Sequence, residues 1–168
     1  MTEPALGELI GVGKEAEVFA CGALVAKLYK PEAPKRSAFR EAAILAALEP
    51  LGLPAPTVHG VRQIGGRWGV LMSRVEGPPL ADAVKHASAS PTSLLERMAR
   101  LQLQIHSQPA TQFAGLKTRL AANIRQAPRL SEARRGALLA ELAAMPDGDR
   151  LCHGDFHPYN IMGPAGRD

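Results

Sequence analysis

The 168-residue sequence has few cysteines and no long apolar segment. Its two cysteines, Cys21 and Cys152, are too few for a disulfide framework, so we expect both to be reduced thiols. No apolar run approaches the ~20 residues that a membrane-spanning helix needs. The opening residues, Met1 to Pro4, have no signal-peptide character. These absences predict a cytoplasmic protein without a membrane partner.

Basic residues are concentrated in one segment, but they do not indicate a nucleic-acid partner. The net charge is +4, and the stretch from residue 117 to residue 135 contains one acid, Glu132, and six cations. These are Lys117, Arg119, Arg125, Arg129, Arg134 and Arg135. Their spacing is typical of solvated helix faces, and the segment lacks the interleaved aromatic side chains of a nucleic-acid surface.

The most informative segment runs from Leu151 to Asn160. Within it, His153, Asp155 and Asn160 have the spacing H-x-D-x-x-x-x-N. Kinase-type enzymes use this spacing for an Asp that accepts the proton of an attacking hydroxyl and an Asn that holds Mg²⁺. The pattern therefore predicts phosphoryl transfer.

A glycine-rich segment near the N-terminus fits the same chemistry. Leu6 to Ile10 is predicted as a strand that leads into Gly11 to Val18, G-V-G-K-E-A-E-V. In the pattern G-x-G-x-x-A-x-V, glycines let the backbone approach phosphate oxygens. A tight β-turn is the alternative. A dinucleotide-binding fold fits less well, because Glu17 to Cys21 is predicted to continue as a strand and not as a helix.

A lysine lies within a short apolar strand. Alternation in Ala23 to Tyr29 places Lys27 on one face together with Val25 and Tyr29. A lysine at such a position is costly to bury without a partner. It is therefore either an edge lysine that points to water or a lysine that binds phosphates.

The next segment offers an acidic partner. Pro34 to Leu48 is predicted as a helix in which Glu41 shares a face with Ile44 and Leu45. A carboxylate on the apolar side of a helix predicts a cation facing it, and Lys27 is the candidate. A solvated Glu41 at the border of the apolar stripe is the alternative.

Strands and then helices complete the expected layout. Thr57 to Gln63 is predicted as a strand, Gly65-Gly66 as a hairpin turn, and the segment after Trp68 as a strand that ends near Gly77. Beyond these elements the pattern becomes helical. We expect one helix from Pro91 through His106, a second around Leu116, Leu120 and Ile124, and a third with Ser131 as N-cap.

Together these motifs resemble the aminoglycoside phosphotransferase family, a group of small-molecule kinases that share the protein-kinase fold and include choline kinase-like enzymes. The segment Cys152 to Met162 carries the most specific match, since the family's catalytic loop reads H-G-D-x-H-x-x-N. The resemblance implies an α+β, protein-kinase-like fold. Residues 1–77 would form a lobe with a five-stranded antiparallel sheet and one helix, and residues 78–168 a partial, mostly helical lobe.

The resemblance also implies ATP and Mg²⁺ as cofactors and a small-molecule hydroxyl as the acceptor. Val70 to Val75 resembles the family's hinge, which implies adenine bonding to the Ser73 carbonyl and the Val75 amide. The implied catalytic residues are Asp155, Asn160, Lys27, Glu41 and His153, with Asn160 as the metal ligand. The implied nucleotide-binding residues are Gly11, Gly13, Ala16, Val18, Val25, Lys27, Met72, Ser73 and Val75.

The sequence departs from the family pattern after Asn160. The family's second metal ligand is an Asp that follows the Asn by roughly fifteen to twenty residues, whereas Asp168 comes directly after the turn segment Pro164 to Arg167 and is not assigned that role. We therefore expect a fragment of a longer protein or a degenerate relative, a nucleotide-binding pseudokinase. A metal-dependent phosphoesterase with ligands among Cys152, His153, Asp155 and His157 is a more remote alternative. The acceptor and the oligomeric state stay open.

Overall fold

The computed structural model describes residues 4–86 and 90–163. The chain divides into two compact units, one formed by residues 1–98 and 155–168 and the other by residues 99–154. Asp168 and the turn segment before it lie outside the described residues. The lobe boundary expected after residue 77 stays a prediction.

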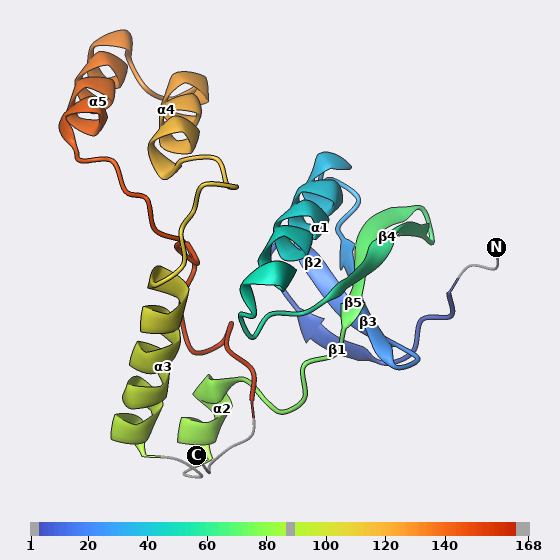
Figure 1. Cartoon of the computed structure of the whole chain (residues 1–168). Coiled ribbons are helices and arrows are strands. Elements are labelled where there is room, and N and C mark those ends of the chain that lie inside the picture. Colours follow the sequence, from blue (N-terminus) through green and yellow to red (C-terminus); the bar gives the residue numbers. More distant parts are fainter. Residues whose placement is uncertain (1–3, 87–89, 164–168) are drawn as a thin grey trace. The chain divides into compact units, whose positions relative to one another are not determined.

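A five-stranded antiparallel sheet forms the N-terminal part of the first unit (Figure 1). Its strands are β1 (Leu9–Val12), β2 (Ala16–Cys21), β3 (Leu24–Tyr29), β4 (Val58–Ile64) and β5 (Arg67–Ser73), in the order β1-β2-β3-β5-β4. The turn before β5 consists of Gly65 and Gly66, both with positive φ, as a tight hairpin requires. The sheet and the helices that follow it confirm the predicted α+β fold class.

The first strand begins later than the sequence pattern predicts. The prediction of a strand from Leu6 to Ile10 is wrong at both ends, since β1 begins at Leu9 and continues to Val12. Gly11 pairs with Val18, and the register shifts between Leu9 and Gly11, where the strand is irregular. The pairing with β2 therefore extends into the glycine-rich segment and leaves a short turn before Ala16.

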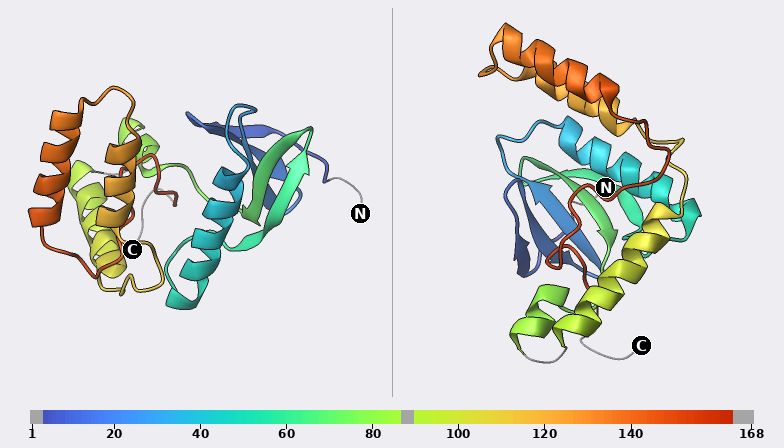
Figure 2. Two further views of the ribbon diagram at one scale, coloured as in Figure 1. Left: turned by 90° about the horizontal axis from the view of Figure 1, so that it is seen from above. Right: turned by 90° about the vertical axis from the view of Figure 1, so that its left-hand side faces the viewer.

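Helix α1 (Arg36–Leu48) lies against one face of the sheet (Figure 2). Ala38 and Ala42 are its buried residues, and Leu45 packs beside them. Ile44, which was expected on the buried face, is 39% exposed. Small alanine side chains let the helix axis approach the sheet closely, so the buried stripe runs through the alanines and not through the larger Ile44.

The first turn of α1 is attached to β5 by an aromatic contact. The rings of Phe39 and Trp68 lie 5.5 Å apart, and the Lys35 ammonium lies 4.3 Å from the centre of the Trp68 ring. A cation over an indole ring is stabilised by the negative face of the ring. This contact restrains the direction in which α1 crosses the sheet.

The opposite face of the sheet has a second apolar cluster and an arginine. Ala26, Leu28 and Ile64 form the cluster. Arg67 at the start of β5 donates to the carbonyl oxygens of Leu28 and Tyr29, both at 2.9 Å, and pairs with Glu17 at 2.8 Å. The guanidinium thus joins the ends of β2 and β3 to β5.

Gly69 permits the close approach of β3 and β5. A Cβ atom at this position would lie 2.4 Å from Leu28 Cδ2 and 2.6 Å from the Lys27 carbonyl oxygen. The second of these atoms belongs to the backbone and cannot turn away. The absence of a side chain at Gly69 therefore sets the spacing of the strand that carries Lys27.

We expect Gly69→Ala to destabilise the protein by about 1–3 kcal/mol, because the added methyl group overpacks two paired strands. Urea unfolding followed by circular dichroism measures the change. The matched control is Gly136→Ala in α5 (Glu132–Ala144), where a Cβ meets no atom within 4 Å. That substitution should be neutral or stabilising, since alanine favours a helix over glycine. Equal stability of the unmodified protein and Gly69→Ala would contradict the packing argument.

Within residues 4–86 and 90–163, four further helices follow the sheet. They are α2 (Leu80–Lys85), α3 (Pro91–His106), α4 (Leu116–Gln126) and α5, and the last three match the predicted helices. The short 3-10 helix η1 (Glu49–Leu51) follows α1. Ser131 is the N-cap of α5, as predicted, and accepts a hydrogen bond from the Arg134 amide. Among the described residues, no helix is both long and apolar enough to span a bilayer.

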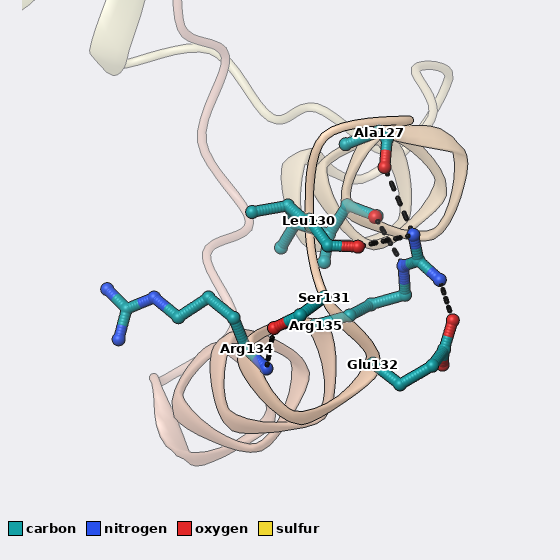
Figure 3. A network of polar contacts seen from close by, with 7 residues as sticks. Ala127, Leu130, Ser131, Glu132, Arg134 and Arg135 are labelled. Carbon is teal, nitrogen blue, oxygen red and sulfur yellow. Dashed lines mark hydrogen bonds and ion pairs between the residues drawn. The ribbon is translucent and has the colours of Figure 1, made fainter.

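Two basic residues hold the ends of the α4 and α5 hairpin. Arg135, in the first turn of α5, donates to the Ile124 and Ala127 carbonyls at the end of α4 and to the Leu130 carbonyl in the loop before α5, and it pairs with Glu132 (Figure 3). At the other end, Lys117 from the first turn of α4 donates to the carbonyls of Ala143 and Met145 after α5, at 3.3 and 2.7 Å. Each helix thus supplies a cation to the carbonyl end of its neighbour, the favourable side of the helix dipole.

Arg135→Ala should loosen the end of α4, because the carbonyls of Ile124 and Ala127 would lose their charged donor and would hydrogen-bond to water only. We expect hydrogen exchange at residues 124–130 to accelerate by about tenfold or more, as loss of about 1.5–3 kcal/mol implies. The matched control is Arg134→Ala, since the Arg134 guanidinium points away from the network in Figure 3. Equal exchange in the two variants would show that Arg135 contributes no local stability.

Candidate functional site

The sheet brings Ala16 and four other predicted nucleotide-binding residues to the face that α1 covers. Val18 on β2 lies opposite Lys27 on β3, and Val25 on β3 lies opposite Met72 on β5. Because successive side chains of a strand alternate, these residues share one side of the sheet. Val25 and Met72 are 7% and 6% exposed and belong to the core beneath α1. Lys27 is thus surrounded by apolar side chains on its own strand and on both neighbours.

The expected ion pair between the sheet and α1 is present. Lys27 Nζ lies 2.6 Å from Glu41 Oε1, and the two side chains are 32% and 24% exposed. The pair is therefore only partly shielded from water. An ion pair of this exposure contributes about 1 kcal/mol or less to stability, so its significance lies in orientation more than in folding energy.

Tyr29 is a third member of this contact, and sequence reasoning missed it. Its hydroxyl donates to Glu41 Oε2, the oxygen that Lys27 does not use. Burial, the bond to Glu41 and the negative charge of Glu41 raise the pKa of Tyr29 above its ordinary value, and Glu15 adds to this effect while Arg40 opposes it. Strand alternation already placed Tyr29 on the face of Lys27, and this was the signal that could have found it.

The glycine-rich segment is a closed turn. The Gly13 amide donates to the Ala16 carbonyl at 2.8 Å, and a Cβ atom on Gly13 would lie 3.1 Å from that oxygen. Gly11 lies within β1, opposite Val18. Ala16, the alanine of the pattern G-x-G-x-x-A-x-V, is 5% exposed and pairs with Tyr29. Its methyl group therefore belongs to the core under α1.

The predicted hinge, Val70 to Val75, consists of the end of β5 and the two residues that follow it. Ser73 is the last residue of β5. Its hydroxyl oxygen accepts a hydrogen bond from the Thr57 amide at 2.9 Å, and its own amide donates to the Thr57 carbonyl at 2.9 Å. These contacts fix the start of β4 to the end of β5. Val75, two residues further on, is 39% exposed. Its proposed contact with adenine stays a prediction.

The loop that carries Asp155 is folded by Asn160. The Asn160 side-chain nitrogen donates to Asp155 Oδ2 at 2.8 Å and to the Asp155 carbonyl at 3.0 Å. His157 Nε2 lies 3.5 Å from the other carboxylate oxygen, Oδ1. The Asp155 side chain is 75% exposed. The loop thus presents a solvent-accessible carboxylate, and the amide oxygen of Asn160 is the atom suited to a metal ion.

Backbone hydrogen bonds attach this loop to the segment after the hinge. The amides of Leu80 and Ala81 donate to the Ile161 and Pro158 carbonyls at 2.8 and 3.1 Å, and the Gly163 amide donates to the Pro78 carbonyl at 3.1 Å. The first two bonds satisfy N–H groups at the start of α2, which have no partner within the helix. Residues 158–163 are thereby fixed to residues 78–81.

Tyr159, the residue before Asn160, contacts α2. The Lys85 ammonium lies 4.9 Å from the centre of the Tyr159 ring. Hydrogen bonds of the Lys85 ammonium with Tyr159 and Asp82 favour its charged form and so raise the pKa of Lys85. The ring therefore adds a side-chain contact to the backbone bonds between the loop and α2.

The remaining predicted site residue, His153, is exposed and lies at the end of the second unit. Its role in bracing the loop stays a prediction. Within residues 4–86 and 90–163, no group of three or more His, Cys, Asp or Glu side chains is arranged to hold a metal ion.

A model of the phosphotransferase enzyme family matches residues 7–167. Among solved structures, the chain is similar to an aminoglycoside-3'-phosphotransferase of type VIII, with 21% identity over 98% of this chain and a TM-score of 0.56. A Ralstonia eutropha protein provisionally assigned as an aminoglycoside phosphotransferase is 16% identical over 99% of this chain, with a TM-score of 0.58. The chain spans 68% and 57% of these two proteins. No curated protein matches it significantly.

Proposed function

Because the chain belongs to the phosphotransferase enzyme family, we propose that it moves the γ-phosphate of ATP to a hydroxyl group of a small molecule. The observation that carries this proposal is the contact of Lys27 with Glu41 at 2.6 Å on the apolar face of the sheet. A cation held by a carboxylate among apolar side chains suits the α- and β-phosphates of a nucleotide.

The nucleotide is assigned to the side chains and amides of the N-terminal sheet. Val18, Val25 and Met72 supply apolar surface for adenine, while the Ser73 carbonyl and the Val75 amide bond its polar edge. The turn at Gly13 covers the phosphates, since a backbone without a Cβ atom allows close approach to their oxygens. Lys27 then binds these oxygens while Glu41 holds it in place.

The loop around Asp155 is assigned to the acceptor and the metal. Asp155 accepts the proton of the attacking hydroxyl and aligns it with the γ-phosphate. Asn160 contributes its amide oxygen to Mg²⁺, since its nitrogen is already used by Asp155. When bound, Mg²⁺ neutralises the charge that develops on the transferred phosphate. A cytoplasmic location, where ATP is available, suits this chemistry and stays a prediction.

The acceptor is proposed as a small hydroxyl compound and not as a particular antibiotic. The similar solved structures are named as aminoglycoside phosphotransferases, but at 21% and 16% identity they indicate the fold alone. The same fold and motifs serve many chemistries. A panel of aminoglycosides, choline-like amines and sugars covers the acceptors worth testing.

Lys27→Ala should weaken Mg-ATP binding by tenfold or more, because the variant loses a charge-assisted hydrogen bond to phosphate. Such a bond contributes about 1.5–3 kcal/mol to the binding free energy. The melting temperature should change little, because the partly exposed ion pair adds little stability. Calorimetry with Mg-ATP and a thermal melt separate the two effects. Lys30→Ala is the matched control, because Lys30 directly follows β3, is half-buried as Lys27 is, and has no assigned role in nucleotide binding. This variant should bind Mg-ATP as the unmodified protein does. Equal Mg-ATP affinity of Lys27→Ala and the unmodified protein would refute the nucleotide assignment.

Asp155→Asn should remove most turnover, by about 10²-fold or more, and leave Mg-ATP affinity nearly unchanged, because the carboxylate acts on the acceptor proton. Coupled assay of ADP release across the acceptor panel measures turnover. Asp149→Asn, which alters an exposed carboxylate beside Arg150, should retain activity. Loss of Mg-ATP binding in Asp155→Asn would make Asp155 a structural or metal-binding residue. An unmodified protein that binds Mg-ATP but phosphorylates no acceptor would favour the pseudokinase alternative.

A further inference from the structure

Tyr29 has no task in the proposed chemistry, yet it bonds the carboxylate that pairs with Lys27. It follows Lys27 by two residues on β3 and therefore points to the same side of the sheet. Its hydroxyl donates to Glu41 Oε2, while Lys27 donates to Glu41 Oε1 at 2.6 Å. Glu41 thus receives one donor on each oxygen, and both donors come from one strand.

Tyr29 is the more rigid of the two donors. It is 8% exposed, and its ring packs in the core with Ala38 and Ala42 of α1. Its carbonyl is also held, since it accepts a bond from Arg67 Nε at 2.9 Å. Lys27 has a long flexible stem, and its side chain is 32% exposed. The fixed hydroxyl therefore determines where the carboxylate lies, and the carboxylate determines where the ammonium lies.

The hydroxyl keeps its proton under ordinary conditions. Burial and the neighbouring Glu41 raise the pKa of Tyr29 above its ordinary value, and that value is already about 10 for a free tyrosine. Tyr29 is therefore a donor at every pH at which the enzyme would be assayed. Its bond to Glu41 is a constant feature of the contact.

We propose that Tyr29 is a positioning residue that fixes the Glu41 carboxylate and, through it, the Lys27 ammonium. The inference rests on the proposed binding of phosphate by Lys27. Without the hydroxyl, Glu41 Oε2 loses its donor and the carboxylate gains access to other rotamers. Mg-ATP must then order both side chains when it binds, and this ordering lowers its affinity.

The test is a double-mutant cycle read by calorimetry with Mg-ATP. Tyr29→Phe removes the hydroxyl and keeps the ring, and we expect affinity to fall by roughly threefold to tenfold. In the Glu41→Ala background the same substitution should change affinity by less than about twofold, because no carboxylate remains to be positioned. An equal loss in both backgrounds, or no loss in either, overturns the proposal.

The matched control for the cycle is Glu17→Gln. Glu17 pairs with Arg67 on the opposite side of the sheet, and the two side chains are 29% and 22% exposed, similar to Glu41 and Lys27. This variant loses a comparable ion pair and should retain the Mg-ATP affinity of the unmodified protein. Circular dichroism of each variant confirms that it is folded.

A second measurement needs no nucleotide. Tyr29→Phe should increase the rate at which acetic anhydride labels Lys27, measured by mass spectrometry, while labelling of Lys14 stays unchanged. An unaltered Lys27 rate overturns the positioning role. Failure of the unmodified protein to bind Mg-ATP would overturn the proposed function, whereas normal binding that Tyr29→Phe leaves intact would overturn only the role of Tyr29.

Discussion

The bridge from Glu41 to β3 is the contact on which the geometry of the sheet and α1 depends. Alanine side chains bury the helix against the sheet, and apolar contacts of this kind have no preferred direction. They permit α1 to slide or rotate over β3. The two bonds of Glu41 have fixed donors and acceptors, so they select one position of the helix along the strand. The contact of Lys35 with Trp68 restrains the N-terminal end of α1.

That bridge in turn requires the correct register of the sheet. A slip of one residue between β3 and its neighbours would move Lys27 to the face that holds Leu28 and Arg67. The positive-φ glycines of the tight turns and the close approach at Gly69 prevent such a slip. The chemistry of the site therefore depends on residues that carry no functional group.

Short-range patterns revealed most of the sheet and the helices, because alternation, turn glycines and capping residues act between near neighbours. The ion pair of Lys27 with Glu41 was predicted in this way. The burial of α1 through Ala42 and the exposure of Ile44 were not, since close packing favours small side chains over the most apolar ones. The bonds between residues 78–81 and 158–163 involve backbone atoms, which leave no trace in the pattern of side chains. Lys117 and Arg135 were predicted to be solvated, yet both bond helix-end carbonyls.

The reciprocal bonds of Lys117 and Arg135 make the lengths of α4 and α5 interdependent. Each cation lies in the first turn of its helix and reaches the last carbonyls of the other. Insertion of a single residue in one helix would rotate its end by about 100° and advance it by about 1.5 Å. The cation in the first turn of the other helix would then no longer reach the carbonyls at that end. Length changes in this hairpin should therefore be accepted in evolution only when both helices change together and by about whole turns.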